Sequence, residues 1–208
     1  MNALDLARWN VLWQSVSNHG GGHAWFETLD AHYAEPHRHY HTARHIAECL
    51  TEFDRARAEA SQPAPVELAL WFHDAIYDTR RSDNEEQSAL LAVECLSEAC
   101  AIATLRQSVH DLVRATKTHD PSIHADAPLL VDIDLSILGT DPHRFHEYEE
   151  QIRQEYAWVP EDVFNTKRAE ILESFLSRKS IYSTQRFLRS HEERARKNLE
   201  ASSKQLRR

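Results

Sequence analysis

The sequence predicts an all-α fold, and three observations lead to it. Only four glycines occur among 208 residues, and three of them form one run at 20–22. Alanine, leucine, glutamate and arginine, which favour helix, are abundant. Apolar residues recur at three- and four-residue spacing along most of the chain. Because 41% of residues are hydrophobic and no long linker divides them, we expect one helical domain over 1–208, with its core at about 24–180.

The N-terminal third predicts three helices. Residues 4–16 carry one apolar stripe, and the glycine run then breaks the pattern. A second helix is expected at about 24–33, where Pro36 ends it because the residue before a proline disfavours helix. A longer helix is expected from Tyr40 onward, so that His41 and His45 would share one of its faces.

The middle of the chain contains its most apolar segment. Residues 66–77 read VELALWFHDAIY, which predicts a buried helix with His73 and Asp74 inside it. Asp83 followed by Glu86 three residues later predicts a capping box at the start of the next helix.

Further helices are expected at 105–116 and 129–138. The second of these segments is short and apolar, so a strand is also compatible, but nothing else in the chain offers a partner strand. Gly139 suits the end of that helix. Asp141 and Pro142 suit the start of the following one, and another is expected at about 161–178. Residues 184–208 are highly charged, which predicts an exposed helix or tail that frays.

Composition excludes several classes of function. A formal net charge of −9 argues against broad nucleic-acid binding, although it leaves room for a local basic pocket. The N-terminus lacks a signal-peptide pattern, and no segment is long and apolar enough to span a bilayer. Cys49, Cys95 and Cys100 show no paired metal spacing, so buried, reduced thiols are expected. We therefore expect a cytoplasmic protein. Its oligomeric state stays open, with a homodimer among the alternatives.

Four residues in three segments form a candidate metal site: His45, the adjacent pair His73 and Asp74, and Asp134. Imidazole and carboxylate suit borderline divalent metals, and a bound cation would offset the cost of burying a carboxylate. Spacing alone leaves open the ordinary interpretation that these groups are scattered by chance. Spacing also does not decide the role of Asp132, which could be the ligand in place of Asp134 or could support Asp134.

Other polar residues are candidates for the surrounding chemistry. His41 would lie one turn from His45 and is a candidate proton donor, although it also fits a surface histidine in a histidine-rich stretch. Candidate phosphate contacts are Arg38, Lys117 and Arg168, and spacing cannot choose among them. The metal could be Mn, Co, Ni, Mg, Zn or Fe, since ligand type does not decide its identity.

Four blocks of sequence resemble, in order, the HD-domain superfamily of metal-dependent phosphohydrolases, and most closely a bacterial group of predicted members. They are EPHRHYHTARHI at 35–46, FHDAIYD at 72–78, DNEEQSA at 83–89 and DIDLSILG at 132–139. The resemblance implies an HD-domain-like helical bundle with His45, His73, Asp74 and Asp134 as metal ligands. It implies hydrolysis of a phosphate ester or anhydride of a small molecule, with a nucleotide as one candidate, and places Asp74 among the catalytic residues.

The pattern Tyr40-His41-x-x-x-His45 also resembles the cyclic-nucleotide phosphodiesterases of the same superfamily, in which the first histidine is the proton donor and the second a metal ligand. This implies that His41 is the general acid. The chain lacks the large catalytic domain and nucleotide-binding glutamine region of those enzymes, which argues against a cyclic nucleotide.

The resemblance also leaves alternatives. Some members hold a second metal with additional histidines, for which His119 is a candidate here, with Asp78 and Asp132 as second-metal or supporting residues. A pair of irons would make the protein an HD-type di-iron oxygenase. A third alternative is a non-catalytic module that senses a metal or a nucleotide.

Overall fold

The computed structural model describes residues 4–17, 20–118 and 122–207, and within these ranges the regular secondary structure is entirely helical. The predicted all-α fold class is therefore confirmed. The chain divides into two compact units, Met1–Asp134 and Leu135–Arg208, each described here by itself. Whether the chain acts as the single domain expected from the sequence stays a prediction.

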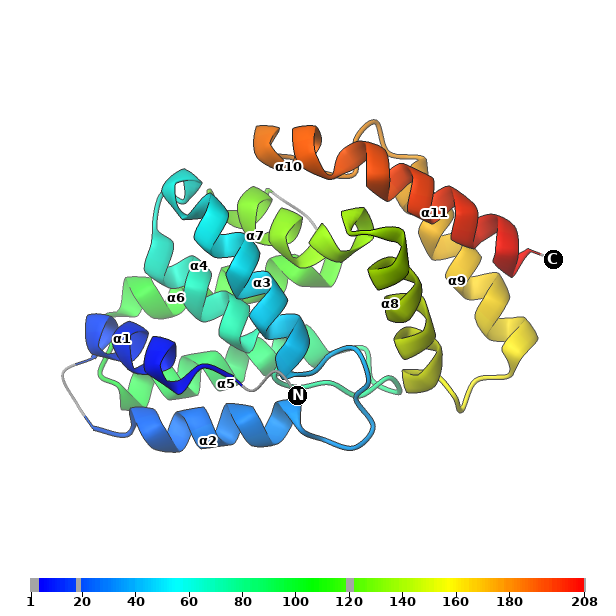
Figure 1. Ribbon diagram of the computed structural model, residues 1–208. Coiled ribbons are helices and arrows are strands. Elements are labelled where there is room, and N and C mark those ends of the chain that lie inside the picture. The colour runs from blue at the N-terminus through cyan, green and yellow to red at the C-terminus, as the bar shows by residue number, and fades with distance from the viewer. Residues whose placement is uncertain (1–3, 18–19, 119–121, 208) are drawn as a thin grey trace. The chain divides into compact units, whose positions relative to one another are not determined.

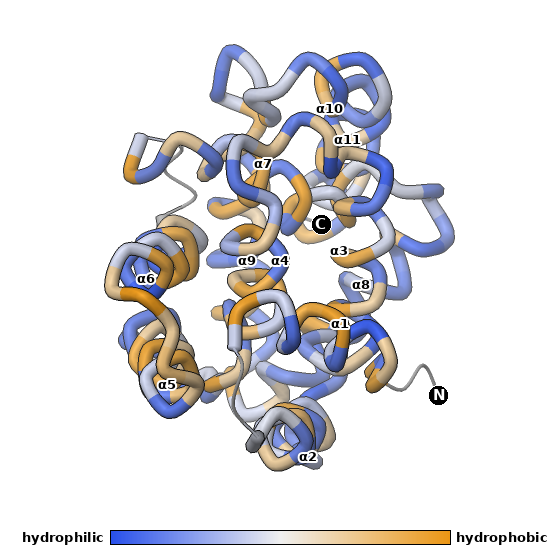
Figure 2. The backbone as a smooth tube through the Cα atoms, turned by 90° about the vertical axis from the view of Figure 1, so that its left-hand side faces the viewer, coloured by the Kyte–Doolittle hydropathy of each residue, from blue (hydrophilic) through white to orange (hydrophobic). Residues whose placement is uncertain are grey.

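The first unit contains the candidate site (Figure 1). Its helices are α1 (Leu6–Val16), α2 (Gly22–Tyr33), α3 (Ala43–Ala56), η1 (Arg57–Glu59), α4 (Pro63–Phe72), α5 (Asn84–Glu98), α6 (Ala103–Thr118) and α7 (Ala127–Asp134). The apolar segment α4 packs against α1, α3, α5, α6 and α7, which accounts for its apolar character on all sides. Figure 2 shows the apolar stretches of α4 and α7 in orange. Since α3, α4 and α7 pack against one another, they can bring distant side chains together.

Three local predictions are wrong. Helix α4 ends at Phe72, so His73 and Asp74 follow the helix instead of lying inside it. Helix α3 begins at Ala43 with Thr42 as its N-cap, so His41 precedes the helix and shares no helical face with His45.

The third wrong prediction is the capping box. Asp83 stands at the N-cap of α5, but its side chain makes no cap hydrogen bond. Its carboxylate instead accepts two hydrogen bonds from the Arg81 guanidinium, at 2.9 and 2.7 Å. An ion pair two residues away therefore replaces the expected contact with the backbone.

The second unit contains η2 (Leu135–Gly139), α8 (Pro142–Glu155), α9 (Glu161–Leu176), α10 (Gln185–Ser190) and α11 (Glu192–Leu206). The segment 129–138 is helical, as favoured from the sequence, and Asp141 caps α8 through the backbone N–H of His143. The C-terminal prediction needs correction, because α11 packs against α9 and buries Ala195 and Leu199 completely. Charged residues such as Glu193 and Lys197 lie on its exposed face.

Two further observations bear on composition. The three cysteines are free, and Cys49 and Cys95 are buried as expected. Cys100 is exposed, contrary to expectation, because it lies in the turn that leaves α5. Among the described helices, none combines the length and apolarity needed to cross a membrane.

Candidate metal centre

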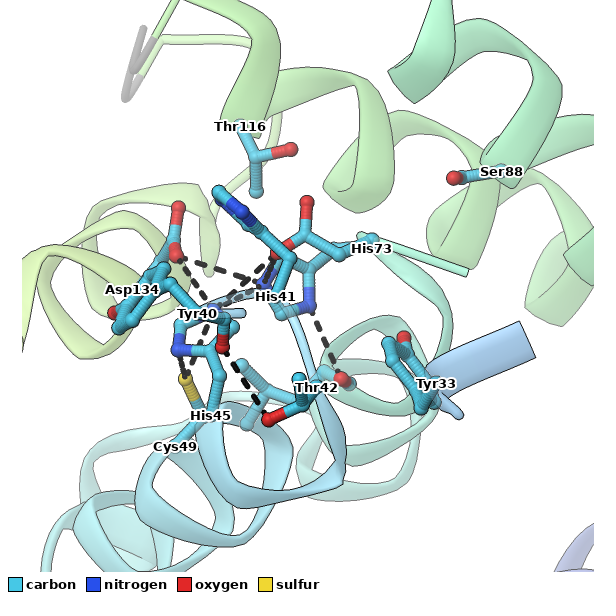
Figure 3. Close-up of polar contacts among 12 residues, drawn as sticks. Tyr33, Tyr40, His41, Thr42, His45, Cys49, His73, Ser88, Thr116 and Asp134 are labelled. Atoms are coloured by element: carbon cyan, nitrogen blue, oxygen red, sulfur yellow. Dashed lines mark hydrogen bonds and ion pairs between the residues drawn. The ribbon is translucent and has the colours of Figure 1, made fainter. Parts of the chain in front are cut away.

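Four side chains from α3, the end of α4 and the end of α7 meet at one point in the first unit. The Nε2 atoms of His45 and His73 lie 3.1 Å apart. An Asp74 oxygen lies 3.3 Å from the His45 nitrogen and 3.1 Å from the His73 nitrogen. An Asp134 oxygen lies 3.4 and 3.5 Å from the same two atoms. The four residues singled out in the sequence therefore converge. Figure 3 labels three of them, His45, His73 and Asp134.

These spacings fit a common cation. Imidazole nitrogen and carboxylate oxygen bind zinc at about 2.0–2.2 Å, which sets neighbouring ligand atoms about 3.3–3.6 Å apart in a tetrahedron and about 2.8–3.1 Å apart in an octahedron. The observed 3.1–3.5 Å spans the two geometries. Two imidazole nitrogens and two carboxylate oxygens at this spacing form a donor set suited to a borderline or hard divalent metal.

Burial differs between the histidines and the aspartates of the site. The side chains of His45 and His73 are only 3% and 1% exposed, whereas those of Asp74 and Asp134 are 18% and 15% exposed. The imidazoles therefore form the floor of the site, and the carboxylates lie on the side that reaches solvent. A cation held here would keep access to water on the carboxylate side.

The His73 ring is fixed by the backbone. Its Nδ1 lies 3.0 Å from the carbonyl oxygen of Leu70, which can only accept a hydrogen bond. Nδ1 therefore carries the proton and donates it, which leaves the lone pair of Nε2 directed at the candidate site when the ring is neutral. A backbone carbonyl that orients a histidine in this way is the usual support for a metal-binding imidazole.

Cys49 is a neighbour of the site that the sequence argument missed. It forms a group of possible ligands with His45, His73 and Asp134, whose ligand atoms all lie within 4.8 Å of one another. Its sulfur, however, lies 3.7 Å from Nδ1 and 3.8 Å from Nε2 of His45. An atom equally far from both ring nitrogens lies on neither lone-pair axis, so the thiol packs against the ring. Asp74 is closer to both imidazoles and remains the candidate fourth ligand.

Electrostatics within the cluster favour charged forms. Burial works to raise the pKa of Asp74, but His73, His41 and His45 hold that pKa well below its usual value. Burial works to lower the pKa of His73, but Asp74 and Asp134 hold it well above the usual value. Burial also works to lower the pKa of His45. Cys49 and Tyr40, and then Asp134 and Asp74, nevertheless hold it well above the usual value. Without a cation, these shifts favour protonated imidazole beside the carboxylates.

His41 lies beside this cluster, in the loop before α3. Its ring stacks on Tyr77, with centroids 4.0 Å apart, and meets the ring of Tyr40 edge-on at 4.9 Å. Its centroid is 6.0 Å from that of His45. Figure 3 shows His41 and Cys49 on opposite sides of the cluster. The aromatic contacts hold His41 near the ligands without making it one of them.

The structure separates the other acidic candidates. Asp132 is completely buried two residues before Asp134 on α7, so the two side chains point to nearly opposite sides of the helix. Asp134 is therefore the residue that reaches the cluster. The Asp78 carboxylate accepts a hydrogen bond from the backbone N–H of Arg80 in a loop. His119 lies outside the described residues, so the second metal stays a prediction.

The cationic candidates are engaged with protein groups. Arg38 is buried and donates to backbone carbonyls and one carboxylate, which argues against the predicted phosphate contact. Arg168, in the second unit, is held by Glu149 and Tyr148, which argues against its phosphate contact as well. Lys117 donates to the carbonyl oxygen of Ser82 at an exposed position and remains a candidate.

Comparison of the chain with family models, with curated proteins and with solved structures gave no match.

Proposed function

We propose that this protein is a metal-dependent phosphohydrolase of HD type that cleaves a phosphate ester or anhydride of a small molecule. The observation that carries the proposal is the convergence of His45, His73, Asp74 and Asp134 at spacings that fit one cation. The position of His41 beside them supplies a second reacting group. The order of these residues along the chain is that of the superfamily it resembles.

The residues have separate roles in the proposed reaction. A divalent cation, when bound, would lower the pKa of a water and polarise a phosphoryl oxygen. The buried imidazoles and partly exposed carboxylates would hold it with open positions toward solvent. In the hydrolysis, a water oxygen bonds to phosphorus and loses a proton to the solvent, and the bond from phosphorus to the leaving oxygen breaks. The bonding electrons stay with that oxygen, which takes a proton from His41.

The test is a hydrolysis screen against phosphorylated metabolites and nucleotides with Mn²⁺, Co²⁺, Ni²⁺ or Mg²⁺. Asp74→Ala should abolish both metal binding and turnover. His41→Ala should retain metal but lose rate by about 10²–10⁴-fold, as is typical for removal of an acid–base group. His39→Ala is the matched control, because His39 is an exposed histidine of the same loop and should retain full rate.

Two results would overturn the proposal. One is a metal-loaded protein that hydrolyses none of these substrates. The other is His41→Ala losing metal while His45→Ala keeps it, which would reverse the two roles. A visible absorption band after aerobic iron loading, without phosphatase activity, would favour the di-iron oxygenase.

A further inference from the structure

Arg38 is a buried cation at the junction of two chain segments that form the candidate site. Its side chain is fully buried. One terminal nitrogen, Nη1, donates to the carbonyl oxygens of His41 at 3.1 Å and Asp74 at 2.6 Å. The other, Nη2, donates to the carbonyl oxygen of Ala75 at 2.8 Å. A single guanidinium therefore joins the loop that carries His41 to the turn that carries Asp74.

The turn after α4 depends on side chains for its hydrogen bonds. A helix leaves its last carbonyls without helical partners, and these need donors from elsewhere when they are buried. Tyr33 donates its hydroxyl to the carbonyl of Trp71, and Ser88 bonds to both backbone groups of Ile76. Arg38 donates to two of the four carbonyls between these positions, those of Asp74 and Ala75. Arg38 thus donates to the backbone of Asp74, a candidate metal ligand.

The guanidinium is held in place by three other contacts. Its Nε donates to Glu35 at 2.9 Å. Its carbon lies 5.3 Å from the centre of the Tyr33 ring and 5.5 Å from that of Tyr77, within the range of cation–π attraction. Tyr77 also stacks on His41. Arg38 therefore contacts the ring that supports His41 as well as the His41 backbone.

We propose that Arg38 is a positioning residue that fixes Asp74 for metal binding and His41 for proton transfer. This inference rests on the proposed metal site. A planar guanidinium can donate to three carbonyls and a carboxylate at once, whereas a lysine ammonium at the same place cannot reach all four. Loss of Arg38 leaves the Asp74 and Ala75 carbonyls without this donor and frees the turn to move away from His45, His73 and Asp134.

The test measures Co²⁺ affinity, which needs no turnover. Arg38→Met should weaken Co²⁺ binding about 10–100-fold, the range found when outer partners of metal ligands are removed. Arg38→Lys should lose less. If Arg38→Met fails to fold, Arg38→Lys alone decides, because its loss must exceed that of the matching control.

The control is Arg196→Met, together with Arg196→Lys. Arg196 in the second unit also donates to one carboxylate, that of Glu192, and to three backbone carbonyls. Its variants should lose comparable stability yet bind Co²⁺ as the wild type does. Equal loss of affinity in the two series, unchanged affinity in the Arg38 variants, or a wild type that binds no Co²⁺ would overturn the inference.

Turnover provides a separate result. If Arg38 acts through His41, Arg38→Lys should lower the rate much less in a His41→Ala background than in the wild type. If the wild type binds Co²⁺ but hydrolyses nothing, the phosphohydrolase proposal fails, while the affinity series still decides the role of Arg38.

Discussion

At the scale of single residues, substitutions of the two acidic residues of α7 test the candidate site most directly. Asp134 reaches both imidazoles, whereas Asp132 is buried on the other side of the same helix. Asp134→Asn should therefore weaken metal binding by at least about tenfold, because a neutral amide is a poorer ligand than a carboxylate. Asp132→Asn, the matched control, should keep wild-type affinity, as isothermal titration would measure. A larger loss for Asp132→Asn would mean that the wrong acid has been assigned.

The pKa shifts of His73 and Asp74 predict how these two groups contribute to the pH dependence of stability. The pKa of His73 is raised above its ordinary 6.5, so its stabilisation of the metal-free protein is complete below that value and is lost as pH rises through the folded-state pKa. The pKa of Asp74 is lowered below its ordinary 3.8, so its contribution is present above that value and is lost as pH falls through the folded-state pKa.

Metal should reverse the first of these trends. Neutral imidazole is the ligand, so binding displaces protons and affinity rises with pH. Denaturant titrations from about pH 6.5 upward should show falling stability of the metal-free protein and a growing stabilisation by added metal. If the metal-free protein instead became more stable over this range, the protonated imidazoles inferred here would be wrong.

At the scale of helices, one carboxylate ties the start of α4 to the segment before α7. The Asp126 side chain is buried and accepts hydrogen bonds from the backbone N–H groups of Ser61 at 2.7 Å and Gln62 at 2.9 Å. Asp126→Ala should destabilise the protein by about 1–2 kcal/mol, the upper part of the range for a lost cap. Chemical denaturation would measure it. Asp141→Ala, which removes an exposed cap of α8, should cost less; a reversed order would contradict this account.

The spacing of apolar residues was sufficient to predict where most helices lie, because packing against a core imposes that spacing. It was not sufficient to predict where α4 ends. That end depends on donors from distant segments, such as the Tyr33 hydroxyl and the Arg38 guanidinium, which no local pattern reveals. The start of α3 could have been predicted, because Thr42 is a good N-cap residue. Its side chain accepts a hydrogen bond from the backbone N–H of Arg44.

The candidate ligands were predictable because their residue types and order are informative. Their surroundings were less so. The four-residue spacing of His45 and Cys49 was visible in the sequence, but nothing there indicated that the thiol would pack on the imidazole. Arg38 was one of three candidate phosphate contacts, because arginine commonly binds phosphate and spacing could not choose among the three. Only the three-dimensional arrangement shows that it is committed to backbone carbonyls.

At the scale of the whole molecule, every candidate ligand belongs to the first compact unit. Metal binding should therefore slow amide hydrogen exchange around α3, the end of α4 and α7. Helices α9 and α11 of the second unit should change little. Exchange measured by mass spectrometry, with Asp74→Ala as the control, would check this. Protection confined to the second unit would place the metal elsewhere.

The candidate ligands come from three stretches of chain that lie far apart in sequence. An isolated peptide from any one of them would hold too few donors to retain an ion. Capture of an ion would thus be a late event that requires α3, α4 and α7 to be already assembled. Once bound, an ion would join the ends of two long loops at the same time, and it would stabilise only the assembled fold because the unfolded chain cannot hold it. A chelator would release both loops together.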